Sequence, residues 1–267
     1  MIPKEIMKLY EKLAFSRGYE EAFRDFLDVC LYYLSVGMLA EDYRRVEKRY
    51  KPYEMELFVQ MFYRVSEYSE GFCDVLGDMF MECVSHGNNG QFFTPIHVAG
   101  LMACMGGNSL KPKQLVCDSC CGSGRMLLSA VKKCAEENDG GRLFCYGSDI
   151  DLICVKMTVV NLMMNSVPGE VAWMNTLTMQ HWRSYHIDLQ LIAGVWLPIL
   201  KITKAGDTSF IRKLENVMED NSELKRSIQS KHSVNHVFFP QTSVINFTSR
   251  KQNYDDTRRN SRDNELL

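Results

Sequence analysis

The sequence lacks a long apolar segment, and this excludes the commonest kind of membrane-spanning protein. The longest apolar run covers residues 191–200, whereas a helix that crosses a bilayer needs roughly 20 such residues. No apolar run follows the charged residues near the N-terminus, so we expect no secretory signal. We therefore expect no membrane partner and a location in the cytoplasm.

Neither sign of charge dominates the chain, which excludes a uniformly basic nucleic-acid-binding protein. The 31 Lys and Arg residues are balanced by 33 Asp and Glu residues, for a net charge of −2. Residues 199–267 are more basic than the rest of the chain. This asymmetry is compatible with a segment that faces a polyanion, but a solvated polar tail is the simpler interpretation.

Cysteine is abundant, but the spacing lacks the second pair that a structural zinc site needs. All ten cysteines lie between Cys30 and Cys154, and the sequence has one Cys-x-x-Cys pair, Cys117 and Cys120. We therefore expect no metal. Several cysteines fall within apolar segments, which predicts reduced thiols in the core. A redox role for the single pair is the alternative.

The first third of the chain has the apolar spacing of helices. Gly71 and Pro52 separate segments that place apolar side chains on one helical face. We expect a helical N-terminal domain over residues 1–88, with helices at residues 3–15, 18–40, 54–67 and 72–85.

Strand and helix patterns alternate after residue 89, which is typical of an α/β domain with a parallel sheet. We expect this domain to cover residues 89–200, with strands at residues 114–117, 143–147, 170–174 and 187–193 and helices at 124–135 and 152–165. A polar extension, partly disordered, would follow over residues 201–267. Its expected elements are a helix at 213–228, strand-like pieces within 234–247 and disorder from 249 onward.

A glycine bend directly after the first expected strand carries the sharpest chemical signal. The stretch Asp118-Ser119-Cys120-Cys121-Gly122-Ser123-Gly124 joins that strand to a helix. It lacks the third glycine of a dinucleotide-binding motif, since Leu127 stands there, and it lacks the Gly-Lys-Ser/Thr of a P-loop. What it does contain fits the nucleoside-binding loop of S-adenosylmethionine methyltransferases, which has an acid at the strand end followed by small residues and Gly-x-Gly.

That third interpretation predicts a second acid at the end of the next strand, where it can accept hydrogen bonds from ribose hydroxyls. The sequence Gly147-Ser148-Asp149-Ile150-Asp151 supplies two candidates. Either carboxylate could instead cap the following helix. We assign Asp149 to the ribose and Asp151 to the helix cap.

Four motifs in this order resemble the N6-adenine DNA methyltransferases, specifically the modification subunits of type I restriction systems. Leu76-Gly77-Asp78 precedes Gly90-Gln91-Phe92-Phe93-Thr94-Pro95, which resembles that family's Gly-Gln-Phe/Tyr-Phe/Tyr-Thr-Pro. The glycine bend resembles its Asp-Pro-Ala-Cys-Gly-Ser-Gly, and residues 147–151 resemble its Gly-x-Glu-x-Asp. Asn161-Leu162 and Asn175-Thr176-Leu177 follow as in the family.

The resemblance implies roles for individual residues around an S-adenosylmethionine cofactor. Gln91, Phe93 and Thr94 would close over its methionine end, and Pro95 would occupy the first position of the next helix. Asp118 would take the amino group, while the backbone at Cys120, Gly122 and Gly124 would pass close to the ligand. Asn175 would face the adenine ring. At least one of Phe92 and Phe93 is expected simply to pack in the core.

The family's catalytic motif, Asn/Asp-Pro-Pro-Tyr/Phe, is absent from the sequence. Its expected place, after the strand that ends near Ile192, reads Ala193-Gly194-Val195-Trp196-Leu197-Pro198. Trp196 could stack on a flipped base, but no neighbour accepts a hydrogen bond from the adenine amino group, so the catalytic residues are unknown. An interior or interface position is the simpler expectation for Trp196.

Together these features predict a Rossmann-like S-adenosylmethionine-dependent methyltransferase fold behind an α-helical N-terminal domain. The expected function is methylation of adenine N6 in DNA as part of a restriction-modification system, with DNA and a specificity subunit as partners. Two alternatives remain. The chain could bind the cofactor without catalysing transfer and serve a specificity or restriction subunit, or it could methylate RNA, protein or a small molecule.

Overall fold

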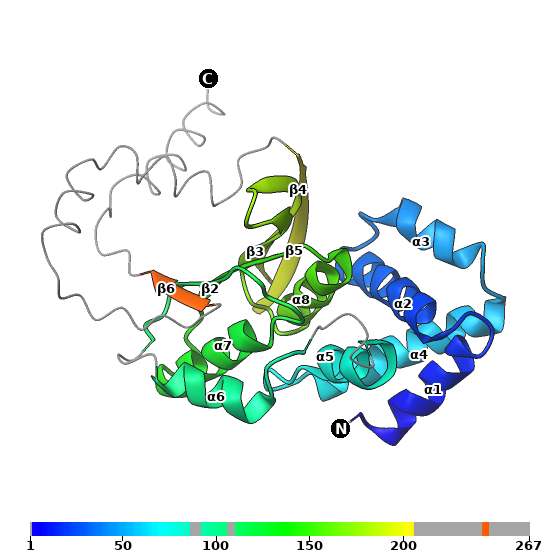
Figure 1. Cartoon of the computed structure of the whole chain (residues 1–267), viewed down its shortest axis with the longest axis horizontal. Coiled ribbons are helices and arrows are strands. Elements are labelled where there is room, and N and C mark those ends of the chain that lie inside the picture. The colour runs from blue at the N-terminus through cyan, green and yellow to red at the C-terminus, as the bar shows by residue number, and fades with distance from the viewer. Residues whose placement is uncertain (1, 86–91, 106–109, 206–241, 246–267) are drawn as a thin grey trace, which may run out of the picture.

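A computed structural model describes residues 2–85, 92–105, 110–205 and 242–245 of the chain. Within these residues, helices lie against a six-stranded sheet in a mixed α/β arrangement (Figure 1). The helices are α1 (Lys4–Ala14), α2 (Tyr19–Leu34), α3 (Ala40–Glu47), α4 (Pro52–Tyr68), α5 (Val75–Met79), the π-helical turn η1 (Phe80–Ser85), α6 (Ile96–Met105), α7 (Arg125–Glu137) and α8 (Leu152–Met164). The strands are β1 (Leu115–Asp118), β2 (Phe144–Asp149), β3 (Gly169–Asn175), β4 (Gln180–Ile192), β5 (Val195–Lys204) and β6 (Thr242–Ile245).

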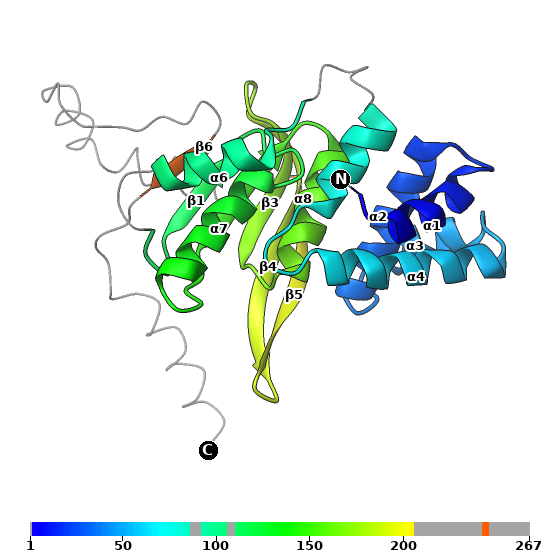
Figure 2. The same cartoon turned by 90° about the horizontal axis from the view of Figure 1, so that it is seen from below.

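The helices α1 to α4 gather beside the sheet and share its buried core. Tyr10 of α1, Phe26 of α2 and Phe58 of α4 are fully buried, and the rings of Phe26 and Phe58 stack. Helix α2 also packs against α8, which covers the sheet (Figure 2). The buried apolar side chains therefore form one continuous cluster that extends from α1 to the strands.

The three central strands are parallel, as the alternation of strands and helices predicts. Strand β2 pairs in parallel with both β1 and β3, and the helices α7 and α8 form the connections between them. The full strand order is β5-β4-β3-β2-β1-β6. Adjacent parallel strands end at the same edge of the sheet, so Asp118 and Asp149 lie at one edge.

The strand predicted at residues 187–193 is confirmed over residues 187–192, but its predicted parallel orientation is wrong. Residues 187–192 form the second half of β4, which is antiparallel to β3 and continues into a hairpin with β5. Ala193 and Gly194 join the two strands with φ angles of 50° and 83°. Two consecutive residues with positive φ are typical of the tight turn whose twist matches an antiparallel hairpin.

The hairpin places its turn far from the edge that carries the two carboxylates. Asn175, at the end of β3, pairs with Gln180, and Gly169, at its start, pairs with Ile187. Strand β4 therefore runs back along β3 and continues past its beginning. The hairpin projects beyond the rest of the sheet (Figure 2), so the segment from Ala193 to Pro198 lies at the opposite end from Asp118.

Three predicted helix boundaries are also wrong. The helix expected from residue 72 begins at Val75, because the side chain of Asp74 accepts a hydrogen bond from the Gly77 N–H and caps it. The helix expected over residues 18–40 ends at Leu34, and a separate helix, α3, follows. Pro95 precedes α6, which begins at Ile96, instead of occupying its first position; its carbonyl accepts the first α-helical hydrogen bond, from the Ala99 N–H.

Few of the C-terminal expectations fall on described residues. The strand expected within residues 234–247 is confirmed at β6, which pairs antiparallel with β1. The helix expected at 213–228 and the disorder expected from 249 lie outside the described residues. No helix in the described part of the chain is long and apolar enough to cross a membrane.

Candidate functional site

Two carboxylates stand at the ends of neighbouring parallel strands. Asp118 ends β1 and pairs in register with Gly147 of β2, so Asp149 extends two residues further along the same edge. The bend from Ser119 to Gly124 leaves β1 between them and leads into α7. In open α/β sheets, ligands bind outside the carboxyl ends of the parallel strands. This edge is therefore the natural place for a ligand.

Asp118 is buried, and none of the described residues provides a counter-charge for it. Its residue surface is 1% exposed, and its carboxylate accepts a hydrogen bond from the Cys120 N–H at 3.1 Å. Burial, helped by the nearby Asp149 and opposed by that hydrogen bond, raises the pKa of Asp118 to about 7. No lysine or arginine in the described segments forms an ion pair with it. A ligand with a positive charge would fit this carboxylate.

Asp149 ties the glycine bend to the end of β2. One carboxylate oxygen accepts a hydrogen bond from the Gly122 N–H at 2.9 Å, and the other accepts one from the Asp151 N–H, also at 2.9 Å. Burial raises the pKa of Asp149 above its usual range, although these hydrogen bonds lower it. Asp151 itself accepts from the Ile153 N–H at 2.9 Å and caps α8, which confirms the assignment of the cap to Asp151.

The bend depends on two glycines with positive φ. Gly122 has a φ of 55°, and a Cβ atom there would lie 2.9 Å from the ring of Phe93. Gly124 has a φ of 82°, and a Cβ atom there would lie 3.0 Å from Thr158. The Thr158 hydroxyl also donates to the Gly122 carbonyl at 2.9 Å. Only glycine meets both the conformational and the steric demands of these positions.

The segment before α6 forms a second wall beside the bend. The ring of Phe93 stacks on Phe80 at 5.4 Å between centroids and packs against the main core cluster, whereas Phe92 is exposed. This confirms that one of the two phenylalanines packs in the core. Thr94 is half-buried. Gln91, the third residue expected in this wall, lies outside the described residues.

The remaining predicted residues lie at the same edge with different surroundings. Cys120 is exposed, and burial raises the pKa of the neighbouring Cys117 to about 12, which keeps that thiol protonated at neutral pH. Asn175 is half-buried at the end of β3. Its side-chain carbonyl accepts hydrogen bonds from the backbone N–H groups of Leu177 and Thr178 at 3.0 and 3.2 Å.

A buried polar network beside the bend was not predicted from the sequence. Its centre is Asp74, whose carboxylate accepts hydrogen bonds from Ser123, Arg125, Asn161 and the Gly77 N–H. Arg125 and Asp74 are 51 positions apart in the chain, so no local pattern could pair them. The available signal was the charged side chain of Arg125 at the start of α7, directly before the apolar residues Met126-Leu127-Leu128.

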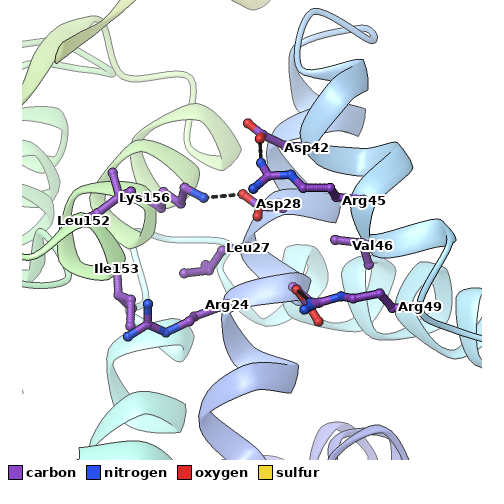
Figure 3. Close-up of a pocket in the computed structure, with 11 residues that line it drawn as sticks. Arg24, Leu27, Asp28, Asp42, Arg45, Val46, Arg49, Leu152, Ile153 and Lys156 are labelled. Carbon is purple, nitrogen blue, oxygen red and sulfur yellow. Dashed lines mark hydrogen bonds and ion pairs between the residues drawn. The ribbon is translucent and has the colours of Figure 1, made fainter. Parts of the chain in front are cut away.

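A pocket of about 280 Å³ lies elsewhere, between α2, α3 and α8 (Figure 3). Each of its basic side chains already pairs with a carboxylate. Lys156 of α8 reaches across to Asp28 of α2, and the other pairs are Arg24–Glu20, Arg45–Asp42 and Arg49–Asp25. The pocket therefore offers no uncompensated charge to select an ionic ligand. The described residues also contain no group of three side chains suited to a metal ion.

Comparison with known proteins agrees with the motifs. Residues 72–193 match the model of the family described as N-6 DNA Methylase. Over 113 residues, 40% of the chain, the sequence is 26% identical to the type I restriction enzyme MjaVII methylase subunit of Methanocaldococcus jannaschii. The match spans 19% of that relative's length. Residues 72–193, which match the family model, include the glycine bend, Asp118, Asp149 and Asp74. The chain thus resembles the N6-adenine DNA methyltransferases, with a type I methylase subunit among its relatives.

Proposed function

We propose that the chain binds S-adenosylmethionine at the carboxyl ends of β1 and β2. The observation that carries the proposal is the arrangement of two carboxylates around a glycine bend. Asp118 is buried and has no counter-charge among the residues that the structure describes, which suits an ammonium group. Asp149 holds the bend through the Gly122 N–H and retains acceptor capacity for ribose hydroxyls.

The other predicted residues complete this proposed site. Thr94 and Phe93, with Gln91, would close over the methionine end of the cofactor, and Asn175 would face the adenine ring. The backbone at Cys120, Gly122 and Gly124 would approach the nucleoside closely, because glycine and small residues allow such an approach. The parallel strands β1 to β3 with the helices α7 and α8 support a Rossmann-like arrangement.

We propose that this site serves the methylation of adenine N6 in DNA within a restriction-modification system. The family match and the methylase relative support a methyltransferase role. The substrate would be DNA, and a specificity subunit would select its sequence. In this proposal, residues 1–88 form a helical domain, residues 89–200 the cofactor domain and residues 201–267 an extension, in a protein of the cytoplasm.

The chemistry asks little of the protein beyond positioning. The cofactor supplies an activated methyl group on sulfur, and transfer needs the acceptor nitrogen in line with it. Asp149 and Asp118 would fix the two polar ends of the cofactor, so that its sulfur lies between fixed points. Phe93, stacked on Phe80, would exclude water from the wall beside the bend.

A second candidate function follows from the β4–β5 hairpin. The expected place of the catalytic motif, from Ala193 to Pro198, begins at the hairpin turn at the end of the sheet opposite Asp118. There, Trp196 is 42% exposed, and the guanidinium of Arg142 lies 5.5 Å from its ring. This position favours a chain that binds the cofactor without catalysing methyl transfer and serves a specificity or restriction subunit.

A two-stage assay with cofactor labelled in the methyl group tests the proposal. Equilibrium dialysis first measures binding to the chain, with Asp149→Ala as the variant expected to lose affinity and Asp188→Ala, on an exposed hairpin ion pair, as the control. Adenine-containing DNA is then added, with and without a specificity subunit. Label in N6-methyladenine supports the methyltransferase, and binding without transfer supports the second candidate. Absence of binding contradicts both.

A further inference from the structure

Arg125, the first residue of α7, is buried between three acceptors on different parts of the chain. Its Nε donates to Asp74 at 2.7 Å, one terminal nitrogen donates to Asp78 at 2.6 Å, and the other donates to the carbonyl of Thr94 at 3.2 Å. Its side chain is 9% exposed. A buried guanidinium with every nitrogen engaged is held in one orientation.

The Asp74 carboxylate fixes the other end of this arrangement. Besides Arg125, it accepts from the Ser123 hydroxyl at 2.5 Å, the Asn161 amide at 2.8 Å and the Gly77 N–H at 2.8 Å. Asn161 in turn donates to the Ser123 carbonyl at 2.8 Å. Ser123 lies between the two glycines of the bend. Asp74 therefore holds the bend directly through the Ser123 hydroxyl and, through Asn161, also by the Ser123 carbonyl.

Arg125 therefore connects the two walls of the proposed cofactor site. One wall is the bend, to which Arg125 is joined by sequence and by Asp74. The other is the segment before α6, which Arg125 grips at the Thr94 carbonyl. Besides this contact, Phe93 anchors the segment by stacking on Phe80, whereas Phe92 and Pro95 are exposed. A lysine at this position would keep the charge but could not reach three acceptors in a plane.

We propose that Arg125, held by Asp74, is a positioning residue that sets the Thr94 wall against the glycine bend and so determines affinity for the amino-acid end of the cofactor. This inference rests on the proposed function. The inference goes beyond the proposed function because it assigns specificity for the amino-acid end of the cofactor to Arg125, a residue that contacts the Thr94 backbone and need not contact the ligand.

Hydrogen exchange of the unliganded chain tests whether Arg125 holds the Thr94 segment against the glycine bend. In Arg125→Lys, amides of residues 93–105 should exchange at least tenfold faster than in the unsubstituted chain, while those of β2 and β3 should not change. The matched control is Arg24→Lys, whose arginine forms an exposed pair with Glu20 on α2. Equal exchange rates of residues 93–105 in Arg125→Lys and in the control would contradict the claim that Arg125 holds the Thr94 segment.

Two ligands that differ only in the amino-acid end test the specificity. S-adenosylhomocysteine carries that end, and 5′-methylthioadenosine has the same nucleoside and thioether without it. Arg125→Lys should bind S-adenosylhomocysteine about tenfold more weakly, or about 1.4 kcal/mol, and 5′-methylthioadenosine as well as the unsubstituted chain does. Asp78→Asn weakens one of the three contacts of Arg125, and the Asp78 side chain is 39% exposed. This variant should lose less affinity for S-adenosylhomocysteine and, like Arg125→Lys, none for 5′-methylthioadenosine.

The outcomes separate this inference from the function on which it rests. An equal loss for both ligands would overturn the positioning role, because the whole site would then depend on Arg125. No loss for either would also overturn it. If thermal unfolding shows that Arg125→Lys does not fold, the affinities of Asp78→Asn for the same two ligands decide whether Arg125 has the positioning role. Failure of the unsubstituted chain to bind either ligand would contradict the proposed function itself.

Discussion

The backbone N–H of Gly122 donates a hydrogen bond to the carboxylate of Asp149 at 2.9 Å. This contact joins the bend after β1 to the end of β2 before any ligand is bound. The same carboxylate accepts the Asp151 N–H, so its orientation is fixed from two sides. A site whose groups are held in place in this way loses less conformational entropy when a ligand binds.

Replacement of Gly122 by alanine should damage the bend. An alanine at a φ of 55° is strained, and its Cβ atom would lie 2.9 Å from the Phe93 ring. We expect a loss of about 2–4 kcal/mol in the free energy of unfolding, since strain alone costs about 1–2 kcal/mol and the clash adds to it. Urea unfolding measures the loss. Gly140→Ala is the control, because its φ is 79° but its surroundings are open; an equal loss there would contradict a role for Phe93.

The buried Asp118 should make both stability and affinity depend on pH. Its pKa is about 7 in the folded chain and near 4 in an unfolded one. The protonated form is therefore favoured by folding, and its contribution to stability is present below pH 4 and lost as the pH rises through 7. The free energy of unfolding should fall over this range by up to about 4 kcal/mol, and Asp118→Asn should flatten the profile.

Affinity should change with pH in the opposite direction. A cationic amino group prefers the ionised carboxylate, so binding of S-adenosylhomocysteine below pH 7 must release a proton from Asp118. We expect the affinity to rise about 15-fold in total between pH 5.5 and pH 7 and to level off about one unit higher. Calorimetric titration at several pH values, in buffers of different ionisation enthalpy, measures both the affinity and the proton release. An affinity for S-adenosylhomocysteine that does not change with pH in the unsubstituted chain would contradict the assignment of Asp118.

Removal of Asp74 should destabilise the fold more than removal of an exposed carboxylate. Asp74→Ala leaves Arg125, Ser123 and Asn161 without their shared acceptor in a buried place. We expect a cost of about 3–5 kcal/mol, which is typical when one partner of a buried pair is removed. Asp188→Ala, whose pair with Lys201 is exposed, should cost less than about 1 kcal/mol. Similar costs in thermal unfolding would show that the network contributes little.

The ion pair of Lys156 and Asp28 should couple the N-terminal helices to the sheet. It joins α8 to α2, and both side chains are about 15% exposed (Figure 3). A double-mutant cycle with Lys156→Ala and Asp28→Ala should give a coupling energy of about 1–3 kcal/mol. The same cycle on the exposed pair of Arg24 and Glu20 should give at most about 0.5 kcal/mol. Coupling no larger in the first cycle would mean that α2 and α8 are held by apolar packing alone.

The central strands and the two carboxylates could be predicted from the sequence because their signals are local. A short apolar strand followed by a bend with glycines, and an acid at the end of the next strand, both fall within a few neighbouring residues. The hairpin was missed for a different reason. Ala193 and Gly194 carry a turn signal, but the strands beside them alternate irregularly, and their antiparallel pairing is decided by contacts with β3.

The network around Asp74 could not be predicted in this way. Its members come from the start of α5, the bend, α7 and α8, and the side chains that donate to Asp74 lie 49 to 87 positions from it in the chain. Asp74 itself reads as an ordinary helix cap, a role it also has. Only the fold shows that the same carboxylate holds Ser123 and Arg125, and thus that the cap also supports the candidate site.

Calorimetric titration of S-adenosylhomocysteine into the chain at pH 7.5 measures whether a nucleoside cofactor binds at the ends of β1 and β2. We expect a saturable heat with one ligand per chain and an affinity that Asp149→Ala reduces at least tenfold and Asp188→Ala leaves unchanged. Absence of heat from the unsubstituted chain, or full binding by a folded Asp149→Ala variant, would contradict the placement of a nucleoside cofactor at the ends of β1 and β2.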